Sequence, residues 1–321
     1  MSFDTKNFYD QLDGHYAAHD NEATERFLLD CLNNLENSVY LAPGCSCCGD
    51  GGSCSTDNDE LSEGEREWLV TRSQGMIAIL NELACFYRGV SRWPECIDSF
   101  TRLKKEMEDC QLTATDNYAL VTLNLAGAYR LMGKLDEALS AFDEAGRILE
   151  ANKKNDPYSI SSLYNNKGLV YQDMRDFAKA SEHFEKALEY MRLVPDNDAE
   201  IATALTNAAM AFYSAGDREK AARLLDESIE MFEKLDGGMN PHYAGALNTK
   251  AIFAFNAGDY ETAAKTFEQA IEKTKLIFGE NREFVIGCRN CSYAYSRLGN
   301  EEMSRKYGDM AAAAEARLPN A

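Results

Sequence analysis

Small and apolar residues recur along the chain with a period of about 42 residues. Each period contains an amphipathic helical pattern, a short polar turn and a second amphipathic pattern. A small residue marks the middle of the first pattern in each unit, at Ala84, Ala126, Gly168, Ala209, Ala251 and Ser292. These positions are 42, 42, 41, 42 and 41 residues apart, so the pattern predicts six tandem helical hairpins.

Side-chain size within each unit indicates how the two helices pair. The second unit carries a small residue, an aromatic residue, a turn glycine, an alanine and a second aromatic residue at Ala126, Tyr129, Gly133, Ala138 and Phe142. Small residues allow two helices to approach closely, and aromatic rings three or four positions away fill the adjacent space. Glycine supplies the left-handed residue that ends the first helix, although Arg175 replaces it in the third unit.

This pattern resembles the tetratricopeptide repeat, and the resemblance covers about residues 80 to 310. The usual repeat has 34 residues, and the longer form here resembles the repeats of kinesin light chains and bacterial peptide-sensing regulators. Those regulators carry an N-terminal helix-turn-helix, which this sequence does not show. The resemblance implies an all-α fold, a right-handed α-α superhelical solenoid of helical hairpins.

We expect three segments along the chain. Residues 1–40 read as an N-terminal helical hairpin and divergent repeat, and residues 41–61 as a loop rich in cysteine and glycine. Residues 62–321 contain the six repeats and a C-terminal capping helix, since a solenoid needs a polar end.

Composition narrows the classes of partner. The formal net charge of −20 makes nucleic acid and anionic membrane surfaces poor partners. The N-terminus has no basic and apolar leader, and no apolar run is long enough to span a membrane, so we expect a cytoplasmic protein. Its ten cysteines are then reduced thiols and not a disulfide framework.

One position of the first helices carries a row of amides. This asparagine row comprises Asn124, Asn166, Asn207, Asn248 and Asn290, with Asn248 one position away from the others in register. An amide offers both donors and an acceptor, which match the N–H and C=O groups of a peptide. By resemblance, the row faces the concave groove and holds a protein or extended peptide. Asparagine in this position also hydrogen-bonds between helices, so a structural role stays open.

Three arginines are expected beside the asparagine row, at Arg88, Arg130 and Arg297. Arginine pairs with carboxylates, so an acidic or mixed peptide is one possible ligand. Relatives that clamp a terminal carboxylate use lysine and arginine where this chain has Ser162 and Asn166, so that clamp is not reproduced here.

Catalytic and cofactor-binding motifs are absent from the sequence. The four histidines lie outside any known catalytic context, and we predict neither enzymatic activity nor a cofactor. Cys288 and Cys291 lie within a predicted helix. Burial explains these two, as well as Cys85 and Cys96, better than redox chemistry. The main hypothesis is therefore a non-catalytic scaffold or adaptor for proteins or peptides.

An alternative function rests on the segment CSCCGDGGSC. Its four thiols, Cys45, Cys47, Cys48 and Cys54, would make the protein a metal- or redox-responsive regulatory adaptor. Structural zinc sites usually draw two ligand pairs from separate segments, whereas these cysteines share one short run. A loop at the entrance of the binding array is therefore the favoured interpretation.

Overall fold

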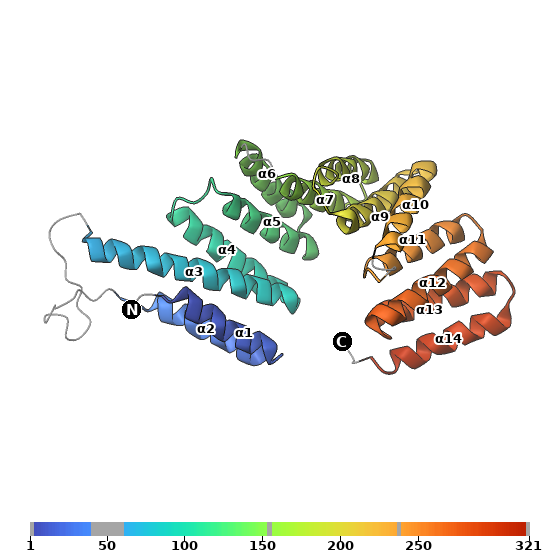
Figure 1. Cartoon of the computed structure of the whole chain (residues 1–321), viewed down its shortest axis with the longest axis horizontal. Helices are drawn as coiled ribbons and strands as arrows, with labels where there is room; N and C mark the ends of the chain where they lie inside the picture. The colour runs from blue at the N-terminus through green and yellow to red at the C-terminus, as the bar shows by residue number, and fades with distance from the viewer. Residues whose placement is uncertain (1–2, 40–60, 153–155, 236–238, 319–321) are drawn as a thin grey trace. The chain divides into compact units, whose positions relative to one another are not determined.

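The computed structural model of the protein describes residues 3–39, 61–152, 156–235 and 239–318. Within these ranges the chain forms fourteen α-helices and no strand (Figure 1). The predicted all-α repeat fold is confirmed. The helices are α1 Thr5–Ala17, α2 Asn21–Glu36, α3 Glu63–Gly89, α4 Trp93–Asp109, α5 Asp116–Leu131, α6 Leu135–Ala151, α7 Pro157–Asp173, α8 Phe177–Met191, α9 Asp198–Ala215, α10 Arg218–Lys234, α11 Tyr243–Asn256, α12 Tyr260–Phe278, α13 Arg282–Arg297 and α14 Glu301–Glu315.

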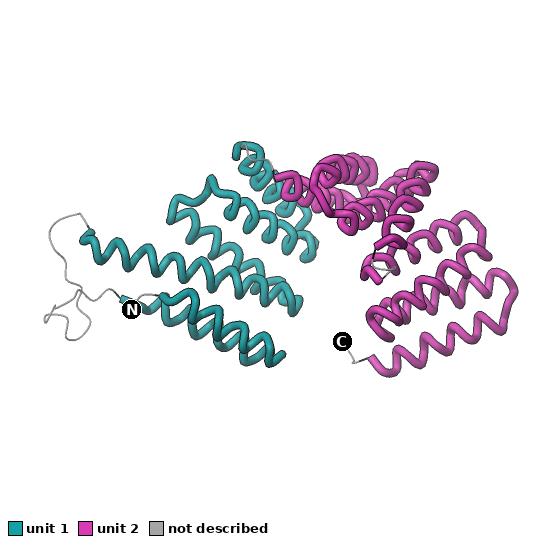
Figure 2. The backbone as a smooth tube through the Cα atoms, in the orientation of Figure 1, with its two compact units in different colours: residues 1–155 teal, residues 156–321 magenta. Residues whose placement is uncertain are grey.

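The chain divides into two compact units, residues 1–155 (unit 1) and residues 156–321 (unit 2), which Figure 2 shows in two colours. In unit 1, α1 packs on α2, α2 on α3, and the pairs α3–α4 and α5–α6 follow. Unit 2 contains the pairs α7–α8, α9–α10, α11–α12 and α13–α14. Each second helix in unit 2 also packs against the next first helix, so consecutive pairs share a core.

The turns within the pairs follow the predicted chemistry. Gly258 ends α11 with φ +84°, in the left-handed region that favours glycine. Arg175 occupies the same place after α7 with φ +61°, so the turn keeps its geometry without glycine. An aspartate is the N-cap residue of the next helix. Asp176 and Asp259 each accept a hydrogen bond from a backbone N–H three residues later.

Buried aromatic rings fill the space between paired helices. Phe100, Phe142 and Phe184 have no exposed surface. The second helix of each of these pairs has a small residue one turn before its ring, as at Ala138 and Ala180. In the pair α7–α8 the ring of Phe184 lies so close to α7 that a Cβ atom on Gly168 would stand 2.9 Å from it. The small residue of the repeat is therefore required by packing.

The last pair shows how the array ends in unit 2. Helix α14 is the second helix of that pair and includes residues 310–315 of the expected polar cap. Glu268 of α12 accepts hydrogen bonds of 2.8 Å from the hydroxyl groups of Tyr295 and Tyr307, which ties α13 and α14 to the preceding pair.

We expect Gly168→Ala to destabilise the protein by about 1–2 kcal/mol, because the added methyl group overpacks against Phe184. Gly127→Ala is the matched control. It lies within α5 with nothing within 4 Å of its Cβ position, so alanine should stabilise by about 0.5–1 kcal/mol. Urea unfolding followed by circular dichroism checks both signs, and equal shifts in the two variants would contradict the packing role.

Alkaline pH should weaken the contact between α10 and α11. Tyr243 is buried and its hydroxyl group donates to Glu233 Oε1 at 3.0 Å. Burial and this carboxylate raise the pKa of Tyr243 to about 12 from an ordinary value near 10. The contribution of this hydrogen bond to the free energy of unfolding is therefore complete below pH 10 and is lost as the pH rises through 12.

The free energy of unfolding of the Tyr243→Phe variant should accordingly fall less than that of the wild type above pH 10. Tyr293→Phe is the control, because its side chain is 55% exposed. Denaturant midpoints measured on both sides of pH 10 test this expectation, and an identical pH dependence in the wild type and Tyr243→Phe would disprove it.

Candidate functional site

The asparagine row lies on the first helices of five pairs, and all five side chains are half-buried. Asn124 belongs to α5 in unit 1. Asn166, Asn207, Asn248 and Asn290 belong to α7, α9, α11 and α13 in unit 2. The row is therefore divided between the two units, and unit 2 holds four of its members.

Three of these amides hydrogen-bond within the protein. Asn124 Oδ1 accepts from Arg88 at 3.1 Å, which joins α5 to α3. Asn207 Nδ2 donates to Asn165 Oδ1 at 3.2 Å, which joins α9 to α7. Asn166 Nδ2 donates to the carbonyl of Ser162 at 2.9 Å in its own helix. The structural alternative thus has support, but each amide keeps further donors or acceptors for a ligand.

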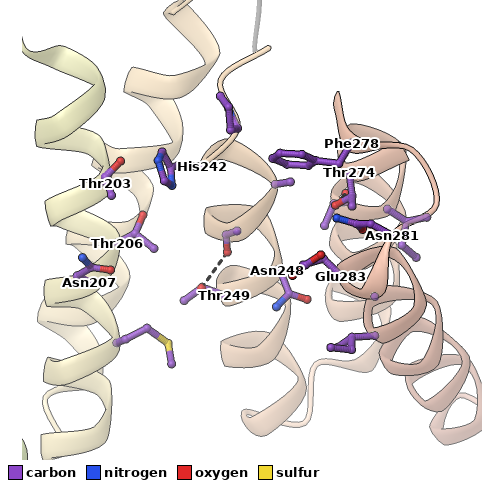
Figure 3. Close-up of a pocket in the computed structure, with 18 residues that line it drawn as sticks. Thr203, Thr206, Asn207, His242, Asn248, Thr249, Thr274, Phe278, Asn281 and Glu283 are labelled. Carbon is purple, nitrogen blue, oxygen red and sulfur yellow. Dashed lines mark hydrogen bonds between the residues drawn. The ribbon is translucent and has the colours of Figure 1, made fainter. Parts of the chain in front are cut away.

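Unit 2 has a cavity of about 720 Å³ between its first helices (Figure 3). Asn207 of α9 and Asn248 of α11 both line it. In Figure 3 the labelled residues of α9 stand on one side of α11, and those of α12 and α13 on the other. Apolar side chains, among them Met210 and Ile271, complete the lining.

A second cavity of about 390 Å³ adjoins the first and extends towards α7. Its lining includes Asn165 and Ser162 of α7. The two cavities share four of their lining residues: Thr203, Asn207, Pro241 and His242. We call the two together the trough. It extends over the first helices of unit 2 from α7 to α13.

The threonines of the trough direct their protons inward. Their hydroxyl groups contact the carbonyl four residues earlier in the same helix at 2.8–3.2 Å: Thr203 to Ala199, Thr206 to Ala202, Thr249 to Gly245 and Thr274 to Ala270. Thr206 also shares a hydrogen bond of 2.8 Å with Ser228 Oγ, in which either oxygen donates. With their protons used in this way, the hydroxyl groups present mainly acceptor lone pairs to the trough.

An aromatic cluster occupies the C-terminal ends of the same first helices. The rings of Tyr213 and Phe253 stack with centroids 4.0 Å apart, and those of Phe255 and Tyr293 lie 5.2 Å apart. Asn290 lines a small cavity of about 180 Å³ beside these rings. Asn290 therefore borders an apolar recess that is distinct from the trough.

The three predicted arginines lie outside these cavities. Arg297 is exposed, with its guanidinium 4.6 Å from the ring centroid of Tyr260. Arg88 is exposed on α3 and donates to Asn124, and Arg130 is half-buried on α5. Arg88 and Arg130 belong to unit 1, so the prediction that all three face one groove remains untested.

Comparison with known proteins fits this architecture. Residues 159–234 match the family model described as tetratricopeptide repeat. The matched residues lie within the pairs α7–α8 and α9–α10. No curated protein matches the chain.

Three solved structures illustrate the likeness. BtubC from P. vanneervenii is 20% identical over 75% of this chain and 94% of that protein, with a TM-score of 0.57. A signal transduction ATPase with a tetratricopeptide repeat sensor from Pyrococcus horikoshii is 18% identical over 78% of this chain and 39% of that protein, with a TM-score of 0.62. The quorum sensor NprR from B. thuringiensis is 12% identical over 96% of this chain and 86% of that protein, with a TM-score of 0.60. At these identities the likeness shows the fold alone.

Several trough residues were not predicted from the sequence. A signal for them exists one turn before the asparagine row, at Ser162, Thr203, Gly245 and Ile286, which are 41, 42 and 41 residues apart. Three of the four are small or hydroxyl-bearing, and the Cβ position of Gly245 faces open space. Small side chains at this position help leave room for the trough between successive first helices.

The cysteines of the repeats are buried thiols. Cys288 and Cys291 have no exposed surface, and burial raises their pKa values to about 11 and about 12. The prediction of burial is confirmed for these two and for Cys96, whereas Cys85 is half-buried. Such thiols remain protonated at neutral pH and are poor nucleophiles.

The cysteine loop of the alternative hypothesis, Cys45, Cys47, Cys48 and Cys54, lies outside the described residues. In the ranges that the structure describes, no three side chains of histidine, cysteine, aspartate or glutamate form a metal-binding group. No described helix is long and apolar enough to cross a membrane.

Thiol labelling should separate these classes of cysteine. In the native protein we expect Cys96, Cys288 and Cys291 to resist maleimide near neutral pH, since they are buried and protonated. Cys110 is half-buried and should react faster. Peptide mapping by mass spectrometry gives the rate at each site, and labelling in denaturant serves as the control. Equal rates at Cys110 and Cys291 in the folded protein would refute the assignment.

Proposed function

We propose that the protein is a non-catalytic adaptor that binds a protein or an extended peptide along the first helices of unit 2. The observation that supports this proposal is the trough, which crosses consecutive first helices and combines amide groups with hydroxyl acceptors. A peptide main chain presents alternating N–H and C=O groups that need such partners. The cytoplasmic location expected from the sequence is part of the proposal.

The trough suits an extended chain better than a compact ligand. It draws on α7, α9, α11, α12 and α13, so a ligand lying along it would contact several repeats in succession. The aromatic cluster adjoins it and offers apolar contacts, with Tyr293 55% exposed. Helices hold most of these side chains, so the surface is largely preformed and a ligand loses less free energy in ordering it.

The solved structures of the same fold are consistent with recognition as its use. One carries a tetratricopeptide repeat sensor and another is a quorum sensor. Among the described residues that line the trough, the ring of His242 forms no hydrogen bond with a serine or a carboxylate, so binding explains the lining better than catalysis.

Replacing three amides should weaken partner binding. In the variant Asn207→Ala, Asn248→Ala, Asn290→Ala we expect at least about a tenfold loss, because each lost hydrogen bond contributes about 0.5–1.5 kcal/mol. The measurement uses the full chain with a photo-crosslinking residue at Met210, which lines the trough, followed by mass spectrometry of the captured protein.

A matched control removes the same chemistry elsewhere. Asn21, Asn33 and Asn256 are exposed and line none of the cavities described above, so their triple alanine variant should keep full binding. Circular dichroism confirms that both variants are folded. Unchanged capture by the folded asparagine variant, or an equal loss in the control, would reject the proposed surface.

A further inference from the structure

The trough has an uneven distribution of charge. Among the described residues that line its two cavities there is no lysine or arginine. The formally charged side chains are two carboxylates, Glu283 in the larger cavity and Glu200 in the smaller. In a chain of net charge −20, a ligand in the trough therefore experiences a negative potential.

Both carboxylates are available to a ligand. Glu200 lies in the first turn of α9 and Glu283 in the first turn of α13, and both are exposed. Neither forms an ion pair or hydrogen bond with another described side chain. Other carboxylates of unit 2 are already paired with cations, as in Arg192–Glu227 at 2.8 Å and Lys250–Asp226 at 2.8 Å.

The hydrogen-bonding groups of the trough favour the same kind of ligand as its charge does. The hydroxyl groups of Thr203, Thr249 and Thr274 use their protons on their own helices and leave lone pairs facing the trough. Thr206 bonds to its own helix and to Ser228 of α10. Ser161 in the smaller cavity likewise donates to the carbonyl of Ala187 at 2.8 Å. Such a lining is best matched by a ligand rich in donors, and an ammonium group has three and a guanidinium five.

The apolar part of the trough suits the same side chains. Met210 and Ile286 line the larger cavity, and Met191 lines the smaller. Lysine and arginine carry methylene stems that pack on apolar surface while the charged end reaches a carboxylate. A carboxylate ligand would meet two like charges.

We propose that the trough of unit 2 binds a basic segment of a partner protein, in which lysine or arginine side chains pair with Glu200 and Glu283. This inference rests on the proposed adaptor function and specifies its ligand. It also differs from the expectation that arginines beside the asparagine row receive an acidic peptide, because the three arginines named for that role do not line the trough.

Defined peptides test the inference on the full chain. The probe is a fluorescein-labelled peptide of alternating lysine and serine, compared with one of alternating glutamate and serine, by fluorescence anisotropy at low ionic strength. We expect the lysine peptide to bind and the glutamate peptide not to bind. The double variant Glu200→Gln, Glu283→Gln should weaken binding of the lysine peptide about fivefold or more.

A charge-matched variant separates a site from general attraction. Glu301 and Glu302 are exposed in the first turn of α14 and do not line the trough, so Glu301→Gln, Glu302→Gln changes the net charge equally. It should change the affinity for the lysine peptide less than twofold. Equal losses in the two double variants, or equal binding of the two peptides, would overturn the inference.

The result is also distinguishable from failure of the adaptor function. If Asn207→Ala, Asn248→Ala, Asn290→Ala abolishes capture of the natural partner while Glu200→Gln, Glu283→Gln leaves it intact, the adaptor function stands and the basic-segment inference is wrong. If the asparagine variant also retains full capture, the adaptor surface itself is wrong.

Discussion

The close approach of two helices within each pair is the constraint on which the rest of this structure depends. At Gly168 the two helices of a pair lie so close that the ring of Phe184 occupies the space that any side chain would need. A helix pair built in this way still has apolar surface that it cannot bury alone, so consecutive pairs must stack. Recurrence of the small residue every 41 or 42 residues is the sequence trace of this requirement.

Stacking also determines where a ligand can bind. Within unit 2 the second helices and the buried faces of the first helices form the cores, which leaves one side of each first helix to line the cavities. Threonine and asparagine are half-buried or buried there, close enough to the core to be held in place. Their polar atoms still reach the trough, so the same helices provide both the core and the proposed binding surface.

Charge is distributed according to the same geometry. The carboxylates of an acidic chain can be spread evenly or gathered at one surface. Here unit 2 pairs many of its cations with carboxylates such as Asp226 and Glu227, and the trough keeps Glu200 and Glu283 without such partners among the described residues. The trough has a negative potential because none of the described residues that line it is a lysine or an arginine.

The repeat, the turns and the buried aromatic residues could be predicted from the sequence, because they depend on contacts between neighbouring segments and repeat with a fixed period. The asparagine row was also visible in the sequence. In the structure Asn124, Asn166 and Asn207 bond within the protein, and Asn207 and Asn248 line the trough. Glu200, Glu283 and the threonines gained their importance only in the tertiary structure. A cavity forms where side chains from several helices leave space, and this property has no signature within a single helix. The sequence therefore determined the architecture, and the packing of the helices decided where the cavities of the proposed binding surface lie.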